Sequence, residues 1–329
     1  MIGLIIGAIA FGGVSAPIKI GITKIVEHPA LDAVEQGIID GLEEAGYREG
    51  IDVDYLLASA QGDMSIAVGI AQDFLAQRVD IVVAITTPMA LATVQVLGGT
   101  DIPVVYSAVT APLAYGIIVS EDDPKQNGNV TGVSDLIDVE NDLQLLRDLG
   151  DGIRKIGLIY NAGEANAEVL KEAALAAAPS VGVEVVTAVA SSPGEVQMAA
   201  QSLIGRVDAY FVTTDNTVVS AIDSVVAAAE EAGVPFLVAD PTSLPLGPVI
   251  AAGFDYYTHG RVTSTVIERI IKGESPEDIA PITHSQIEPE EVWLNLDAAA
   301  KVGLVFPQKL IDLADGIYYG GVIWEKKAD

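Results

Sequence analysis

The chain has 329 residues, of which 46 are acidic and 17 basic, so its formal net charge at pH 7 is −29. Nucleic-acid binding needs clustered Lys and Arg to meet the phosphates, and this chain has no basic run, so we exclude nucleic acid as a partner. The absence of cysteine excludes disulfides, thiolate metal sites, a cysteine nucleophile and a lipid-modified N-terminal cysteine. Half of the residues are hydrophobic, and the length is sufficient for two domains, each with its own core.

An uncharged apolar run, IGLIIGAIAFGGVS, occupies residues 2–15. It has the length of the hydrophobic core of a signal peptide and is too short to span a bilayer comfortably. The sequence VSA before Pro17 resembles a small-residue cleavage site, although no Lys or Arg precedes the run. We predict that residues 1–16 are a signal segment that directs export to the periplasm or another extracytoplasmic space. The alternative is a first buried strand.

From Pro17 to Tyr106 the hydrophobic pattern alternates between the periods of strands and helices. Apolar residues at every fourth position, such as Val34, Ile38 and Leu42, indicate amphipathic helices. Strands alternating with helices of this length predict βαβ units and a parallel sheet. The predicted strands are 18–24, 51–59, 80–84 and 102–106, and the predicted helices lie around 34–42, 66–74 and 89–97.

The second half of the chain repeats this plan. The segment RVDAYFVTTDNTVVSAI (206–222) has the same pattern as RVDIVVAITTPMALATV (78–94), and VPFLVADP (234–241) matches IPVVYSAV (102–109). Several features in the same order favour a duplicated architecture over chance similarity of single strands. The other predicted elements of this half are a strand and polar loop at 154–163, helices at 168–177 and 197–204, and a strand at 183–189.

The C-terminal part does not continue the cycle. It is predicted to contain one long helix within 251–279, followed by a strand and a short helix. Extra elements after a two-lobe repeat return the chain to the first lobe and make a hinge of several connections. The predicted division is 17–110 plus 250–280 for lobe 1, 111–249 plus 281–322 for lobe 2, and a tail at 323–329.

Polar residues follow the predicted strands of both halves. Parallel sheets bind ligands outside the carboxyl ends of their strands, so these residues are candidates for a binding site. The alternative is that they only cap helices, as Thr87 before Pro88 would do. Both roles are compatible, because a helix N-terminus also attracts anions. The candidate residues are His28, Thr86, Thr87, Pro88, Ser107, Asn161, Glu164, Asp215, Asn216, Asp240 and Asp255, and Thr110 and Thr214 occupy equivalent positions.

Catalytic motifs are absent from the sequence: there is no GxSxG elbow, HExxH helix, P-loop or GxGxxG after a strand. Of the three histidines, His28 is interpreted as a ligand contact, and His259 and His284 as solvated or structural. We therefore predict a binding protein and not an enzyme, with no cofactor and no metal. Two lobes with polar strand ends favour capture of a ligand by closure about a hinge.

At this point the sequence resembles a known family, the ABC-transporter substrate-binding proteins of the type that includes members binding tryptophan and other aromatic amino acids. The resemblance runs from about Ile18 to Ile311. It implies a periplasmic-binding-protein type I fold, with two Rossmann-like lobes joined by three crossovers and an amino-acid-like ligand between them. The segments that carry it are HPALD (28–32), TTP (86–88), SAVTAP (107–112), NVTGVSD (129–135), YNAGEANA (160–167), TTDN (213–216), ADP (239–241) and GFDYYTHGR (253–261).

The resemblance also implies roles for the candidate residues. Thr86, Thr87 and the amides at the start of the following helix would hold the ligand carboxylate. Asn161 and Glu164 would close on the ligand from the second lobe. Ala111 replaces an acidic residue that family members often carry, which leaves the identity of the ligand open. The candidates for binding the ligand ammonium and ordering the cleft are Asp215, Asn216, Asp240 and Asp255.

The predicted function is that of an extracytoplasmic solute-binding protein, acting as a monomer, which delivers a small amino-acid-like ligand to an ABC permease in the membrane. An aromatic ligand (Trp, Phe or Tyr) would need a pocket wall, for which Tyr106, Phe254 and Tyr256 are candidates, although core packing is the alternative for each. The alternative functions are a ligand-binding sensor module of the same fold and a binding protein for a sugar or another small polar solute. A sugar is less favoured because Trp293 and Trp324 lie outside the predicted strand-end loops.

Overall fold

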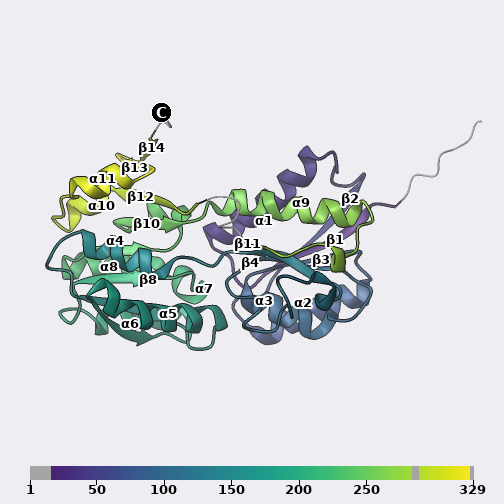
Figure 1. Cartoon of the computed structure of the whole chain (residues 1–329), viewed down its shortest axis with the longest axis horizontal. Coiled ribbons are helices and arrows are strands. Elements are labelled where there is room, and N and C mark those ends of the chain that lie inside the picture. The colour runs from purple at the N-terminus through teal and green to yellow at the C-terminus, as the bar shows by residue number, and fades with distance from the viewer. Residues whose placement is uncertain (1–15, 284–288, 327–329) are drawn as a thin grey trace, which may run out of the picture.

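The computed structural model describes residues 16–283 and 289–326, which form two α/β lobes lying side by side (Figure 1). The first lobe is built on a six-stranded parallel sheet in the order β11-β5-β4-β3-β1-β2. Its central strands β3 and β4 are buried along their whole length, as expected for a parallel sheet covered on both faces. The strands are β1 (Ile18–Lys24), β2 (Val53–Ser59), β3 (Ile81–Ile85), β4 (Val104–Val109), β5 (Val130–Ser134) and β11 (Ile282–Thr283).

The second lobe contains an eight-stranded sheet in the order β14-β13-β12-β10-β9-β8-β6-β7. Strand β12 is antiparallel to β10, and β14 is antiparallel to β13, whereas the other neighbours are parallel. The strands are β6 (Lys155–Tyr160), β7 (Glu184–Val189), β8 (Ala209–Val212), β9 (Phe236–Val238), β10 (Ile250–Gly253), β12 (Glu291–Asn295), β13 (Gly316–Tyr319) and β14 (Val322–Glu325).

Helices cover both sheets, and each lobe has its own buried hydrophobic core. The helices of lobe 1 are α1 (Pro29–Glu44), α2 (Met64–Gln77), α3 (Thr87–Leu97) and α9 (Tyr256–Ile271). Those of lobe 2 are α4 (Val139–Asp148), α5 (Ala165–Val181), α6 (Pro193–Ser202), α7 (Asn216–Val219), α8 (Ile222–Ala232), α10 (Leu296–Lys301) and α11 (Gln308–Leu313). Short 3-10 turns are η1 (Pro124–Asn127), η2 (Pro241–Leu246) and η3 (Pro276–Asp278). Across the described part of the chain, no helix is both long and apolar enough to cross a membrane.

The chain passes between the lobes at three places: between β5 and α4, between β10 and α9, and between β11 and β12 (Figure 1). The predicted α/β architecture with two lobes and mostly parallel sheets is therefore confirmed. Most predicted strands and helices differ from the observed elements by only a few residues at their ends. The predicted signal segment falls on residues that, apart from Ala16, lie outside the described part of the chain, as does His284.

The predicted lobe boundaries differ from the strand pairing. Segment 111–134 returns to the first sheet, because β5 pairs with β4, and β10 belongs to the second sheet, where it pairs with β9. Strand β11 also pairs with β5, and β14 pairs with β13, so residues 322–325 continue lobe 2. The first return could not be predicted from the hydrophobic pattern, because 111–129 contains only η1 and no α-helix whose period could mark a βαβ unit.

Helices α1 and α9 pack so closely that glycine is required at their contact. A Cβ atom on Gly37 would lie 2.1 Å from the carbonyl oxygen of Tyr257, and one on Gly260 would lie 2.2 Å from the carbonyl oxygen of Val34. Both contacts are with backbone, which cannot rotate away as a flexible side chain could. This packing fixes the starts of both helices, which project toward the second lobe.

We predict that Gly260→Ala destabilises the protein although alanine is the better helix former. The added methyl group forces α1 and α9 apart, and overpacking of this kind costs about 1–3 kcal/mol of the free energy of unfolding. The matched control is Gly69→Ala in α2, where nothing lies within 4 Å of the new Cβ and a small gain in stability is expected. Denaturant titration measures both, and equal effects in the two variants would contradict the close contact.

Candidate functional site

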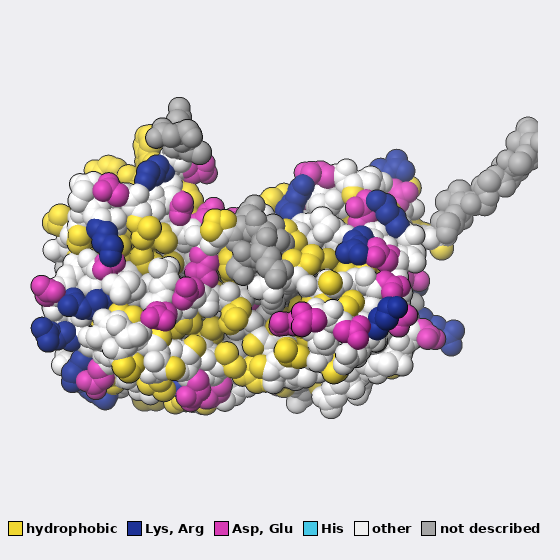
Figure 2. Space-filling view, in the orientation of Figure 1, with side chains coloured by type: hydrophobic (Ala, Val, Ile, Leu, Met, Phe, Trp, Pro, Cys, Tyr) yellow, Lys and Arg dark blue, Asp and Glu magenta, His cyan; other side chains and the backbone are white. Residues whose placement is uncertain are grey.

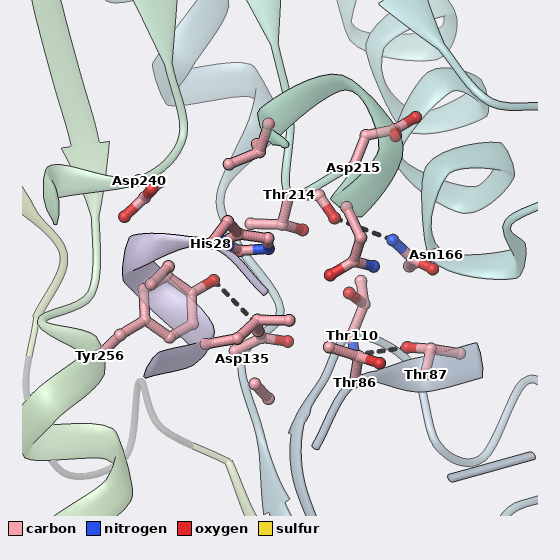
Figure 3. Close-up of a pocket in the computed structure, with 15 residues that line it drawn as sticks. His28, Thr86, Thr87, Thr110, Asp135, Asn166, Thr214, Asp215, Asp240 and Tyr256 are labelled. Carbon is pink, nitrogen blue, oxygen red and sulfur yellow. Dashed lines mark hydrogen bonds between the residues drawn. The ribbon is translucent and has the colours of Figure 1, made fainter. Parts of the chain in front are cut away.

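A cavity with about 370 Å³ of empty space lies between the lobes, at the carboxyl ends of strands from both sheets (Figure 3). The sequence-predicted residues that line it are His28, Thr86, Thr87, Asp215, Asn216 and Asp240. The other lining residues are Ala30, Leu31, Ala108, Thr110, Asp135, Asn166, Thr214, Val219 and Tyr256.

The turn from β3 to α3 contributes Thr86 and Thr87 to the cavity. Thr86 has a φ of 89°, a strained conformation for a residue with a side chain, and such strain costs of order 1–3 kcal/mol. Its N–H donates to the carbonyl of Ser107 at 2.9 Å, but its hydroxyl is buried and has no partner among the described residues. Thr86 therefore does not cap α3 with its side chain, which leaves the hydroxyl and the first amides of the helix facing the cavity.

The end of β4 is also irregular. Ala108 has a φ of 51°, where the pairing register with β5 shifts, and its N–H donates to Nε2 of His259 at 2.9 Å. His259 is fully buried, so its interpretation as a structural residue agrees with its position. The hydroxyl of Ser107 bonds to that of Thr263 at 2.8 Å, which places Ser107 beneath the cavity wall and not in it.

Asp135 and Tyr256 meet at the hinge side of the cavity. Asp135 directly follows β5, at the first connection between the lobes, and Tyr256 begins α9 after the second connection. The Tyr256 hydroxyl donates to Oδ2 of Asp135 at 2.9 Å (Figure 3), whereas Oδ1 is buried without a partner in the described part of the chain. Burial raises the pKa of Asp135 to about 6. Asp135 is therefore a carboxylate with one oxygen bonded to Tyr256 at the hinge and one oxygen without a hydrogen-bond partner in the described residues.

His28 occupies the N-cap position of α1 and is 8% exposed. Neither ring nitrogen has a hydrogen-bond partner among residues 16–283 and 289–326. Burial lowers the pKa of His28, while the Asp240 carboxylate, the nearby side chain of Asn216 and the carboxylates of Asp32 and Glu164 act in the opposite sense. The lowered pKa favours the neutral imidazole, which offers one donor and one acceptor.

In lobe 2, Glu164 holds the loop that leads into α7. Its carboxylate accepts hydrogen bonds from the backbone and side-chain amides of Asn216 at 3.2 and 2.6 Å, and from the N–H and hydroxyl of Thr217 at 2.8 and 2.6 Å. It also accepts from Nδ2 of Asn166 at 3.3 Å. Glu164 lies outside the cavity wall and faces a wider outer cleft between the lobes.

Asp215 is held in the same network. Its carboxylate accepts from the N–H groups of Asn161 at 2.6 Å and Val218 at 3.0 Å. Burial, together with the charge of Glu164, raises the pKa of Asp215 to about 8. Asn161, like Pro88, faces the outer cleft and not the cavity, so the two residues that were expected to close on the ligand, Asn161 and Glu164, instead position the residues that line it.

The remaining predicted acids are engaged by their own helices. Asp240 accepts from the N–H and hydroxyl of Thr242 and from the hydroxyl of Ser243 at 2.5 Å. Asp255 caps α9 by accepting from the N–H of Thr258 at 2.5 Å and does not line the cavity. Of the carboxylates that line the cavity, Asp135 is the one with an unpartnered oxygen in the described residues.

Sequence reasoning missed Asp135 and Asn166 as lining residues, although both lie within segments that carry the family resemblance. Asp135 was placed in the wrong lobe by the boundary at residue 110, so its position at a strand end of the first sheet could not be recognised. Asn166 lies in the first turn of α5, where a polar residue is ordinary. Thr110 and Thr214 had been noted at strand ends and do line the cavity.

Comparison with known proteins is decisive for the family. The family model for "ABC transporter substrate binding protein" matches residues 19–317. The chain belongs to this family. The family comprises solute-binding proteins and not enzymes, and the two-lobed fold is that of the type I periplasmic binding proteins.

Several individual proteins are similar over most of the chain. A tyrosine-binding protein from Clostridioides difficile (strain R20291) is 34% identical over 301 residues, which cover 92% of this chain and 84% of that protein. A structure from Streptococcus pneumoniae in complex with L-Trp has a TM-score of 0.85 at 27% identity, covering 92% of this chain and 100% of the other. The ligand-free, open structure of a substrate-binding protein with adhesive properties from Clostridium difficile has a TM-score of 0.65 at 33% identity, covering 88% and 96%.

We predict that Glu164→Gln lowers the free energy of unfolding by roughly 2–3 kcal/mol. The amide carries no charge, and its N–H groups would face the same donors that now bond to the carboxylate. Ligand affinity should fall as well, since Asn166 and Asn216 lose their support. The matched control is Glu172→Gln on the same helix. Glu172 is exposed and forms an ion pair with Lys171, and in the variant Lys171 still has its ion pair with Glu168. Thermal and chemical denaturation test this, and an equally small effect in both variants would show that Glu164 does not organise the site.

Proposed function

We propose that the protein captures a single amino acid, with an aromatic side chain, in the cavity between its lobes and delivers it outside the cytoplasm to an ABC permease. The observation that carries this proposal is the set of buried polar atoms around the cavity that have no partner in the described residues. They belong to His28, Thr86, Asp135, Asn166 and Thr214. A buried polar group without a hydrogen bond costs about 1–3 kcal/mol, so these atoms favour a ligand with complementary groups.

The ligand carboxylate is expected at the start of α3. The N–H groups of Thr87 and Met89 have no intrahelical partner, Pro88 has no N–H, and the hydroxyl of Thr86 points into the same space. The helix dipole adds a partial positive charge at this end. This group of donors suits an anion.

The ligand ammonium is expected at Asp135. Its free Oδ1 accepts a charge-assisted hydrogen bond, and Oδ1 of Asn166 offers a second acceptor. The candidates from the sequence are Asp215, Asn216, Asp240 and Asp255. The oxygens of the three acids accept from their own loops and helices, and the side chain of Asn216 donates to Glu164. These contacts support an ammonium site at the hinge acid Asp135.

Two observations support capture by closure of the lobes. The hydroxyl of Tyr115, on the loop after β4 in lobe 1, donates to the carbonyl of Ala165 at the start of α5 in lobe 2. The structure is also more similar to the L-Trp complex, with a TM-score of 0.85, than to the open, ligand-free relative at 0.65, although the latter is the more identical in sequence. A rigid-body change in the angle between lobes accounts for such a difference.

An aromatic ligand is supported by the relatives, which are named for tyrosine and L-Trp. A sugar is less favoured because sugar sites usually stack the ring on tryptophan, and Trp293 and Trp324 do not line the cavity.

Calorimetric titration of ligand-stripped protein with the standard amino acids tests the proposal. At least one of L-Tyr, L-Trp and L-Phe should bind with a dissociation constant well below millimolar, and glucose should not. Absence of binding by every amino acid at millimolar concentration would contradict it.

The affinity is also expected to depend on pH through Asp135. The carboxylate form binds the ammonium, and because the pKa of Asp135 in the ligand-free protein is raised to about 6, binding at lower pH must first expel a proton. Affinity should therefore be nearly constant between pH 7 and 8 and should fall by roughly tenfold per pH unit below pH 6.

The variant Asp135→Asn tests whether Asp135, and not another titrating group, causes the loss of affinity at low pH. The variant should bind more weakly at pH 7.5 and should lose most of the decline below pH 6, whereas His28 and Asp215 remain to titrate as before. Circular dichroism at each pH confirms that the variant stays folded. A variant with the same pH profile as the natural protein would rule out Asp135 as the ammonium partner.

A further inference from the structure

The proposed carboxylate and ammonium sites leave some of the unpartnered polar atoms around the cavity unused. As assigned above, the carboxylate takes the donors at Thr86 and the start of α3, and the ammonium takes the acceptors of Asp135 and Asn166. Both ring nitrogens of His28 and the hydroxyl of Thr214 are left, all of them buried and without a partner in the part of the chain described. His28 lines the cavity from lobe 1 and Thr214 from lobe 2 (Figure 3).

The surroundings of His28 exclude the two charged groups of the ligand. The carboxylates of Asp240, Asp32 and Glu164 make the potential around His28 negative, which opposes the ligand carboxylate. The unpartnered Oδ1 of Asp135 is a better acceptor for the ammonium than the oxygens of Asp240, which already accept from Thr242 and Ser243. The position beside His28 is therefore left for the ligand side chain.

A side chain without polar atoms would leave the imidazole of His28 unpaired in the closed cleft. Neutral imidazole has one nitrogen that accepts a hydrogen bond, and a negative environment favours a group that donates one. Among aromatic amino acids, the phenol of tyrosine and the indole N–H of tryptophan supply such a donor, whereas phenylalanine does not. Sites that hydrogen-bond a ligand hydroxyl discriminate strongly against the analogue that lacks it.

We propose that His28 accepts a hydrogen bond from the ring of the ligand and thereby makes the protein select aromatic amino acids whose ring carries an O–H or N–H group. This inference rests on the proposed function and deepens it by assigning the residue that determines specificity. Thr214, with its buried hydroxyl on the opposite lobe, supplies a second polar contact to the same ring group when the cleft is closed.

Calorimetric titration with L-Tyr, L-Trp and L-Phe tests the inference on the natural protein and on His28→Leu and His28→Gln. The natural protein should bind L-Tyr or L-Trp at least about tenfold more tightly than L-Phe. His28→Leu should abolish this preference by weakening binding of the ring donors, while its affinity for L-Phe stays within about threefold. His28→Gln, which keeps a hydrogen-bond acceptor, should retain part of the preference even if the leucine variant does not fold.

Thr93→Val is the matched control, because the Thr93 hydroxyl is likewise buried and unpartnered in the described residues but does not line the cavity. It should leave the ratio of affinities unchanged. Affinity of the natural protein for L-Phe that equals its affinity for both L-Tyr and L-Trp, or an equal loss for all three ligands in both His28 variants, would overturn the inference and leave the proposed function standing. Failure of all amino acids to bind would overturn the proposed function itself.

Discussion

The hydrogen bond between the Tyr256 hydroxyl and Oδ2 of Asp135 connects two of the three chain segments that join the lobes. Because this bond occupies only one carboxylate oxygen, the other is left facing the cavity at the hinge. Tyr256 can take this position because α9 packs against α1 through glycines, which fixes where both helices begin. The site thus depends on the contact between the backbones of α1 and α9. Through it, the Asp135 carboxylate at the hinge becomes part of the cavity wall.

The two lobes contribute to the site in different ways. Lobe 1 presents strained strand ends at Thr86 and Ala108, and helix starts whose polar atoms are unpartnered in the described residues. Lobe 2 presents a segment at the start of α7 that Glu164 and Asp215 hold through several hydrogen bonds, so its shape is set before the lobes close. Negative side chains also spread over the visible surface of both lobes (Figure 2), in agreement with the net charge of −29. The binding energy is therefore expected to come from hydrogen bonds between the ligand and the unpartnered polar atoms of lobe 1, in a cleft that lobe 2 closes.

The sequence was sufficient to predict the alternation of strands and helices and the repeat of TTP (86–88) in TTDN (213–216). It also indicated nine of the residues that line the cavity, namely six candidate site residues together with Thr110, Thr214 and Tyr256. Hydrophobic periodicity could not show which sheet β5 joins, because the irregular segment before it contains no helix. Periodicity also could not distinguish acids whose carboxylate oxygens accept hydrogen bonds within the protein from an acid that has an unpartnered oxygen in the described residues. Glu164 and Asp135 are both buried acids near strand ends, and only their tertiary contacts separate a residue that orders a loop from one that can meet a ligand.

The most direct test of the account is a crystal structure of the protein with L-tyrosine bound. The account predicts that the ligand carboxylate lies within about 3 Å of the Met89 N–H and the Thr86 hydroxyl, and that the ammonium lies at the same distance from Oδ1 of Asp135. The phenol should point toward His28. A ligand bound in the outer cleft beside Glu164, or in the cavity with its carboxylate and ammonium reversed, would contradict it.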